Sequence, residues 1–184
     1  MKRSLMALPV ITVLAVTGCS GGDGQTLADS KSPAQLLRSE AVARIPAHVV
    51  GSTGEFTDDS VACRDPEDDP DELYRAWRSR GEVQLYDAAV AEADATVDQL
   101  IQSFLDQGWS DRSLGSAGVQ YDRFIWSEES SALLRVTAER AGVDPLAVTD
   151  EGAEGAVIIV EARGACVLTG GPDSDEVTSL EQRD

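Results

Sequence analysis

The spacing of apolar residues in the second half of the chain constrains the fold most. From residue 88 to residue 107, apolar side chains recur at intervals of three and four, which is the period of a helix that faces a core. These residues are Val90, Ala93, Val97, Leu100, Ile101 and Phe104. The segments 119–126, 132–139 and 156–162 are short runs of apolar, β-branched and aromatic residues, which are typical of strands. This order predicts a long helix packed on a sheet.

These segments predict an α+β fold: a mainly antiparallel sheet of about four strands, with one long helix packed on one face, plus an N-terminal helix. The short polar turn 127–131 should join the first two strands as an antiparallel pair. The strand at 156–162 is apolar at nearly every position, so we expect it in the centre of the sheet. Residues 73–86 contain Gly81 and predict either one bulged strand or a hairpin.

The N-terminal segment has the pattern of an export signal. Lys2 and Arg3 precede an uncharged, mostly apolar run from Leu5 to Val16. A short cationic stretch followed by such a run is typical of a secretory signal peptide. As a helix, the run would extend roughly 18 Å, whereas a membrane-spanning helix crosses roughly 30 Å of hydrocarbon. We therefore expect cleavage or re-anchoring rather than a transmembrane segment.

The residues Val16-Thr17-Gly18-Cys19 resemble the lipobox of bacterial lipoproteins, in which an aliphatic residue and two small residues precede an obligatory cysteine. The resemblance covers residues 1–19 only. It implies cleavage before Cys19 and attachment of a diacylglyceryl group to the Cys19 thiol, and two acyl chains anchor a protein stably where one holds it only marginally. The alternative is an ordinary signal peptide with an incidental cysteine. The resemblance implies a lipid-anchored protein on the extracytoplasmic face of the cell membrane.

Signals for helices and loops divide the rest of the chain. Ser32 as N-cap and Pro33 in the first turn predict the start of a helix that Pro46 ends. Residues 46–72 show no clear periodicity and are expected to form a loop. The predicted organisation is a signal peptide at 1–18, a lipidated cysteine and flexible tether at 19–31, one α+β domain at 32–167 and an acidic, disordered tail at 168–184.

The charge of the chain limits its partners. Asp and Glu outnumber Lys and Arg by 33 to 15, which gives a formal net charge of −18. Nucleic acids and anionic lipid headgroups are therefore poor partners. The predicted partners are the membrane, reached through the lipid anchor, and an envelope protein or ligand that the sequence does not identify.

Two further cysteines, Cys63 and Cys166, are expected to form a disulfide, because an extracytoplasmic compartment permits oxidation. Closing a loop of about a hundred residues would constrain the unfolded chain by roughly 4 to 5 kcal/mol in the entropic model. The alternative is a reactive thiol with His48 as its base. Neither cysteine lies in a sequence that resembles a cysteine-protease signature.

The sequence contains no complete catalytic or metal-binding motif. The serines in 51–54 and 115–118 lack the spacing of a nucleophile elbow. Neither an H-E-x-x-H motif nor a paired C-x-x-C motif is present, so no metal site and no cofactor are predicted. His48 lies beside Pro46 in an aliphatic segment, four residues from Ser52. It fits a structural or exposed histidine better than a catalytic base.

The run 65–72, which we call the acidic loop, places carboxylates at alternate positions, as calcium loops do. An EF-hand loop also requires Gly at its sixth position and a bidentate Glu at its twelfth, where this chain has Pro70 and Ala76. A solvated acidic loop therefore fits better than a site for a divalent cation.

The densest group of cations and aromatic rings follows the acidic loop. It consists of Tyr74, Arg75, Trp77, Arg78 and Arg80. Arginine with Trp or Tyr is common on recognition surfaces, so these residues are the candidate ligand-binding site for an anionic or polymeric ligand. The alternative is that the arginines neutralise the neighbouring acids and Trp77 faces the core.

Two functions are compatible with these features. The sequence favours a lipid-anchored lipoprotein that serves as a non-catalytic binding or accessory domain of the cell envelope. The alternative is a small envelope hydrolase that uses His48 or clustered carboxylates. A deep cleft that gathers His48 with Ser or Asp would favour the hydrolase, whereas a shallow surface around Trp77 and the arginines would favour binding.

Overall fold

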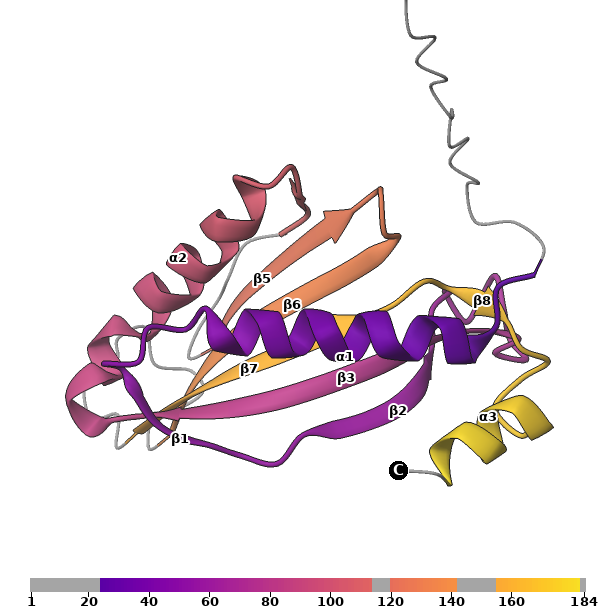
Figure 1. The fold of residues 1–184 in the computed structure, drawn as a ribbon, viewed down its shortest axis with the longest axis horizontal. Coiled ribbons are helices and arrows are strands. Elements are labelled where there is room, and N and C mark those ends of the chain that lie inside the picture. Colours follow the sequence, from indigo (N-terminus) through magenta and orange to yellow (C-terminus); the bar gives the residue numbers. More distant parts are fainter. Residues whose placement is uncertain (1–23, 114–119, 142–154, 183–184) are drawn as a thin grey trace, which may run out of the picture.

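The computed structural model describes residues 24–113, 120–141 and 155–182. In these residues, helices lie over one face of an antiparallel sheet (Figure 1). The helices are α1 (Leu27–Ala43), the 3-10 helix η1 (Asp87–Glu92), α2 (Ala93–Leu105) and α3 (Asp175–Glu181). The strands are β1 (Val50–Thr53), β2 (Thr57–Ala62), β3 (Tyr74–Leu85), β4 (Ser110–Asp111), β5 (Gln120–Ser127), β6 (Ala132–Ala141), β7 (Gly155–Arg163) and β8 (Val167–Leu168).

The strands lie in the order β1-β3-β7-β6-β5-β4, and β2 and β8 also pair with β3. β1 and β2 follow each other along one edge of β3, while β7 and β8 follow each other along the other edge. β5 and β6 pair antiparallel, as the turn between them predicts. β7 lies between β3 and β6, so its predicted central position is confirmed.

The prediction of about four strands with one long helix and an N-terminal helix is wrong. The sheet has eight antiparallel strands, and three α-helices accompany it in the described residues. The largest difference is in 46–72, where β1 and β2 replace the expected loop. Among the six residues of β2, only Ser60 is buried. An edge strand with so little burial needs no alternation of apolar and polar residues, so its sequence carries no strand signal.

Residues 74–85 form one strand and not a hairpin. β3 pairs with β7 without interruption from Arg78 to Gln84, and Gly81 lies within this paired stretch. Gly81 therefore marks neither a turn nor a bulge. Its lack of a side chain serves packing instead, because a Cβ there would come within 3.0 Å of the Phe56 ring.

Helix α1 begins at Leu27, five residues before the predicted start of the domain at 32. Thr26 and Asp29 form a capping box in which each side chain accepts a hydrogen bond from the other residue's backbone N–H. Pro33 lies inside the helix rather than in its first turn. The tether predicted for 19–31 thus overlaps the first turn of α1. The sequence therefore offers two N-caps, Thr26 and Ser32. The helix uses Thr26 as its N-cap because this start buries Leu27.

The C-terminal segment also differs from the prediction of a disordered tail at 168–184. Residues 175–181 form α3, and the Ser174 side chain accepts a hydrogen bond from the Val177 N–H as its N-cap. Val177 and Leu180 are buried. Two apolar residues three positions apart are too short a pattern to predict a helix against an acidic background.

The main core lies between the sheet and the two long helices. α1 covers the half of the sheet formed by β3 and β7, and α2 covers the half formed by β5 and β6 (Figure 1). The helix predicted for 88–107 is present as η1 followed by α2, and its apolar stripe faces the sheet. Members of the main core include Leu37, Ala41, Val83, Val97, Leu100, Ile101, Phe104, Val136, Ile158 and Val160.

A small core lies at the other end of α1. It consists of Leu27, Ala34, Trp77, Val167, Val177 and Leu180, from α1, β3, β8 and α3. Beside it, the predicted disulfide between Cys63 and Cys166 is confirmed, with 5.8 Å between the two Cα atoms. The bond joins the end of β2 to the link between β7 and β8, which lie on opposite edges of β3.

Candidate functional site

Because α1 and α2 pack on the same face of the sheet, the opposite face carries no helix among the residues that the structure describes (Figure 1). Side chains alternate along a strand, so residues next to main-core positions such as Val136 and Val160 point to this opposite face. We call this surface the open face, and its central residues are Arg78, Arg80, Phe124, Trp126, Leu133, Arg135, Glu161 and Arg163.

Strand register arranges the open face into two neighbouring rows. In one row, Arg163 lies between Arg78 of β3 and Leu133 of β6. In the other row, Glu161 lies between Arg80 and Arg135. The open face therefore gathers arginines from three adjacent strands. Their side chains are each between 30% and 39% exposed, which leaves the guanidinium groups accessible to a partner.

Each of these arginines is held by an acid. Arg78 Nε donates to Asp59 Oδ1 over 2.8 Å, and Arg163 Nε donates to Glu161 Oε1 over 2.8 Å. The side chain of Glu161 is only 9% exposed, and its Oε2 also lies 4.0 Å from Arg78 Nη1. Glu161 thus connects the two rows. Charge-assisted hydrogen bonds of this kind fix the direction of a guanidinium group.

The other two arginines have acidic partners further along the strands. Arg80 Nη2 lies 2.8 Å from Glu82 Oε1, and Arg135 Nη2 lies 2.6 Å from Asp122 Oδ2. The hydrogen bond to Asp122 raises the pKa of Arg135, while burial works in the opposite direction. Such a network keeps the guanidinium groups charged and oriented. Their side chains therefore lose little entropy when a partner binds.

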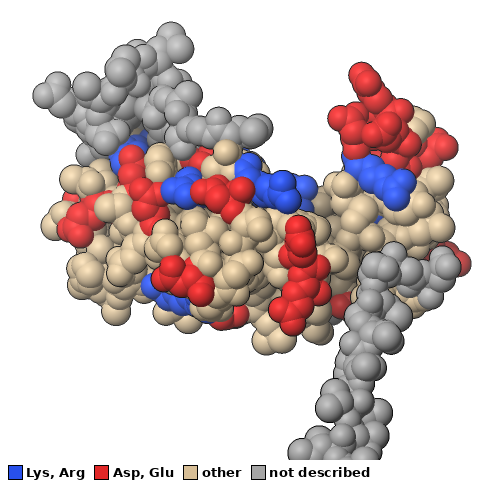
Figure 2. Space-filling model, turned by 90° about the horizontal axis from the view of Figure 1, so that it is seen from above, with Lys and Arg blue, Asp and Glu red and all other residues tan. Residues whose placement is uncertain are grey.

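Aromatic rings from β5 border the arginines. Arg135 Cζ lies 5.1 Å from the centre of the Phe124 ring, and Phe124 and Trp126 are both half-buried. Cationic and acidic side chains alternate along the middle of the upper border of Figure 2, while a mainly acidic area lies at its upper right. Arginine beside Trp and Phe, with acids between, is a composition that protein interfaces favour.

The structure divides the five residues of the predicted binding site between the two faces. Arg78 and Arg80 lie on the open face. Trp77 is fully buried in the small core, and its indole N–H donates to Asp58 over 3.3 Å. Arg75 is also buried, and it donates to the Ser60 carbonyl and to Glu72. Tyr74 is half-buried, with Arg64 Cζ 3.3 Å from the centre of its ring.

Sequence analysis does not identify five residues of the open face as candidates: Phe124, Trp126, Arg135, Glu161 and Arg163. Their signal is weak: Glu161 and Arg163 alternate with apolar residues at the end of β7, and Arg135 is a single charged residue within the apolar first half of β6. That alternation places them on one face of their own strands. Only the register between strands brings them beside Arg78 and Arg80.

The acidic loop uses its carboxylates for its own fold. Asp69 is buried, and its two oxygens accept hydrogen bonds from the N–H groups of Leu73 and Tyr74 over 2.9 and 2.8 Å. Asp65 Oδ1 accepts from the Glu67 N–H. Within the described residues, no group of three or more His, Cys, Asp or Glu side chains is arranged to hold a metal ion.

His48 lies on the surface, with 73% of its side chain exposed, and its Nε2 is 3.9 Å from Glu92 Oε2. Ser52 is exposed on β1. In the described part of the chain, no hydrogen bond joins His48 to a serine or an aspartate. His48 is therefore not placed as a base next to a hydroxyl nucleophile, which would need a separation of about 3 Å.

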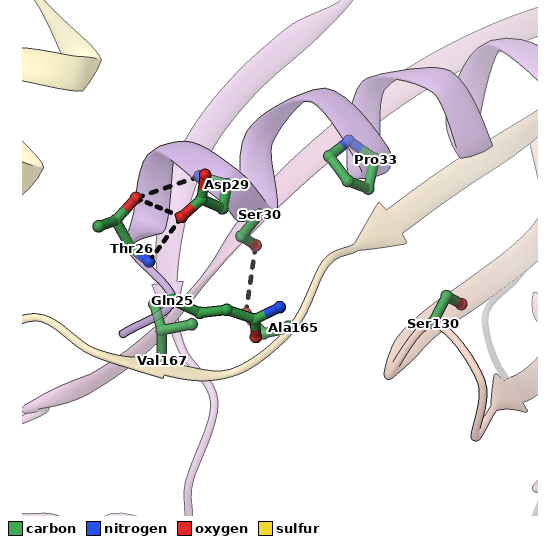
Figure 3. A pocket seen from close by; sticks show the side chains of 8 residues that line it. All are labelled: Gln25, Thr26, Asp29, Ser30, Pro33, Ser130, Ala165 and Val167. Atoms are coloured by element: carbon green, nitrogen blue, oxygen red, sulfur yellow. Dashed lines mark hydrogen bonds between the residues drawn. The ribbon is translucent and has the colours of Figure 1, made fainter. Parts of the chain in front are cut away.

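A small cavity of about 50 Å³ lies at the start of α1, between the β5–β6 turn and the link from β7 to β8 (Figure 3). Its lining residues are Gln25, Thr26, Asp29, Ser30, Pro33, Ser130, Ala165 and Val167. Ser30 Oγ donates to the Ala165 carbonyl and accepts from the Trp77 N–H, both over 3.2 Å. The cavity has room for a few water molecules, each needing about 10 to 15 Å³ of such space.

Comparison of the chain with protein-family models, curated proteins and solved structures gave no match. None of the helices in the described ranges is long and apolar enough to cross a membrane. Cys19 and the rest of the lipobox lie outside the described residues.

Proposed function

We propose that the chain is a lipid-anchored lipoprotein of the cell envelope that binds another envelope protein through the open face of its sheet. The anchor part of this proposal rests on the lipobox at 16–19. The binding part rests on one observation: four accessible arginines, held by acids and bordered by aromatic rings, lie together on the face of the sheet opposite α1 and α2.

Charge complementarity indicates the kind of partner. The chain as a whole is strongly acidic, so a partner surface with few acids of its own would suit most of the molecule. On the open face, the arginines instead favour a partner that presents carboxylates at matching positions. The acids of the open face already orient the guanidinium groups. Binding of such a partner would therefore cost less side-chain entropy.

The anchor is tested by following lipid attachment. Wild-type protein expressed in a bacterial host should incorporate labelled fatty acid and enter the detergent phase with the membrane fraction. The Cys19→Ala variant should lose the label and accumulate as the uncleaved precursor, because the modified thiol is what the signal peptidase requires. Label that survives in Cys19→Ala would contradict the anchor.

The binding surface is tested by photo-crosslinking in cells. A photoreactive residue at Trp126, on the open face, should give a defined protein adduct, while the same residue at Leu36, which is 70% exposed on α1, should not. Charge reversal at Arg163 should abolish the Trp126 adduct, because it places a second carboxylate beside Glu161. An adduct of equal yield from both positions, or one that survives Arg163→Glu, would contradict the proposed surface.

A further inference from the structure

On the helix-covered face, Arg38 of α1 is a buried arginine with two unpaired donors. The residue is 6% exposed, and its Nε and Nη1 atoms are buried without a hydrogen-bond partner among the described residues. Burial lowers the pKa of the Arg38 guanidinium, and the charge of Asp58 opposes this effect. A buried charge whose donors stay unpaired destabilises a fold, so packing alone does not account for Arg38.

Arg44, on the same helix, provides a direct comparison. Its Cζ lies 4.0 Å from the centre of the Phe104 ring, much as Arg38 Cζ lies 3.7 Å from the centre of the Phe56 ring. However, Arg44 Nη1 donates to the carbonyl and the hydroxyl of Ser103 over 3.1 and 2.9 Å. The fold therefore satisfies one ring-stacked arginine of α1 and leaves the other with free donors.

A second buried donor lies on the strand beneath Arg38. Ser79 is fully buried, and its Oγ has no hydrogen-bond partner in the described part of the chain. Two residues further along the same face of β3, Gly81 supports the arginine: a Cβ there would come within 3.2 Å of Arg38 Cδ. Ser79 is thus a second unpaired donor on the face of β3 that α1 covers, two residues from the glycine that Arg38 contacts.

The nearest acid does not satisfy these donors. Asp58, which is opposite Ser79 in the strand register, accepts hydrogen bonds from Gln35 Nε2 and Trp77 Nε1, both over 3.3 Å. Its charge acts on Arg38 through space but leaves Nε and Nη1 unpaired. The same negative charge would repel a dianion more strongly than a monoanion.

Phe56 covers Arg38 from the solvent side. Phe56 is 48% exposed. One side of its ring faces water, and the other side lies over the Arg38 guanidinium. Phe56 belongs to the short connection between β1 and β2. The pairs Thr53 with Val83 and Thr57 with Arg80 hold the strands on either side of it. Exposure of the guanidinium would require only the Phe56 side chain to turn, because the strand pairs on either side do not include Phe56.

We propose that Arg38 and Ser79 form a binding site for a carboxylate, with the ring of Phe56 as its cover. Nε and Nη1 lie on opposite edges of the guanidinium, so a carboxylate would pair with one of them together with Nη2, as Asp122 pairs with Nε and Nη2 of Arg135, and the Ser79 hydroxyl would supply a further donor. A carboxylate suits the site better than a phosphate because it carries a single charge beside Asp58. Binding replaces a cation–π contact with charge-assisted hydrogen bonds in a buried setting.

The test follows the arginine Nε–H signals of the full chain by NMR during titration with sodium acetate, with sodium chloride at equal ionic strength as the reference. The Arg38 signal should shift along a saturating curve in acetate only. Phe56→Ala should lower the dissociation constant for acetate about tenfold, because the ring no longer competes for the guanidinium. Arg44→Leu removes a ring-stacked arginine from the same helix and should leave the acetate response of Arg38 unchanged.

Two outcomes would overturn the proposal: an Arg38 signal that responds equally to acetate and chloride, or acetate binding that is no tighter in Phe56→Ala than in the wild type. The Phe56→Ala variant keeps Arg38, so the test does not depend on whether Arg38→Leu folds. Titration with N-acetylglycine and N-acetylglycinamide separates the sources of the carboxylate. Tighter binding of N-acetylglycine than of acetate assigns the site to peptide C-termini, and equal binding assigns it to small free carboxylates.

Discussion

The main core and the small core are held together in different ways. The main core contains 22 buried apolar residues of the described chain, whereas the small core contains six. Hydrogen bonds between distant segments surround the small core. The Leu27 N–H donates to Glu176 over 2.6 Å, and the Ser60 N–H donates to Glu181 over 3.0 Å. The disulfide adds a covalent link at the same end.

The difference shows what each region requires to stay folded. Apolar burial scales with the area removed from water, so a large cluster stabilises itself without specific partners. A cluster of six residues gains too little in this way to order α1, β8 and α3 against the chain entropy that they lose. We therefore expect the small core to depend on its cross-links and the main core to depend on side-chain volume.

Removal of the disulfide should have the largest effect. The cysteines are 103 residues apart in sequence, and opening such a loop in the entropic model lowers the free energy of unfolding by about 4 to 5 kcal/mol. Urea unfolding of the Cys63→Ala, Cys166→Ala variant measures this loss. Hydrogen exchange should show that α3 and β8 lose protection before α2. Equal loss of protection in α2 would mean that the two cores unfold as one unit.

A matched pair of leucine substitutions compares the cores directly. Leu100 is 2% exposed in the main core, and Leu180 is 8% exposed in the small core. Leu100→Ala should lower the free energy of unfolding by about 3 to 4 kcal/mol, because the surrounding helix and strands cannot collapse into the cavity. Leu180→Ala should cost about 2 kcal/mol or less, since the short α3 can shift. Similar losses in urea unfolding would remove the distinction between the cores.

The sequence predicts the parts of the fold that follow from apolar spacing. The stripe from Val90 to Phe104 predicts the helix over the main core, and the nearly uninterrupted apolar run in β7 predicts its central place. Pairing of Cys63 with Cys166 is the expectation for the two cysteines that remain once Cys19 is assigned to the lipobox, and the structure contains this bond. Each of these signals lies within one segment or in the cysteine count.

The parts that sequence analysis missed depend on contacts between distant segments. β2 is an edge strand whose outward N–H at Ser60 is satisfied by Glu181, more than a hundred residues later. The two arginine rows of the open face depend on the register between β3, β7 and β6. No pattern within one segment carries this information, so β1, β2, α3 and most of the candidate site could not be predicted.

The bond between Glu181 and β2 should contribute less than a core leucine. Glu181 Oε1 accepts from both the N–H and the hydroxyl of Ser60, over 3.0 and 2.8 Å. Glu181→Gln keeps the shape but removes the charge, so we expect a loss of about 1 kcal/mol in the free energy of unfolding. The Ser60 amide should exchange faster with deuterium. Glu128→Gln, in the exposed β5–β6 turn, is the control. Unchanged exchange at Ser60 would show that α3 does not protect this edge.

The smallest expected effect is a pH dependence that belongs to the sheet and not to the small core. Burial raises the pKa of Asp122, but hydrogen bonds from Arg135 and Thr137, with the charge of Arg135, outweigh burial, so the net pKa is lowered from its usual 3.8. Asp122 therefore stabilises the fold at pH values above about 4, where it is also ionised in the unfolded chain. This stability is lost as the pH falls through the lower folded pKa.

Asp122→Asn isolates this contribution, because asparagine keeps an acceptor for Arg135 but does not titrate. At neutral pH the variant should be less stable than the wild type by up to about 1 kcal/mol, the range of partly exposed ion pairs. Urea midpoints measured from neutral pH down to about 2.5 should converge as Asp122 becomes protonated in the wild type. A difference that stays constant over this range would show that Arg135 holds Asp122 by hydrogen-bond geometry and not by charge. Ion pairs would then not distinguish the sheet from the small core.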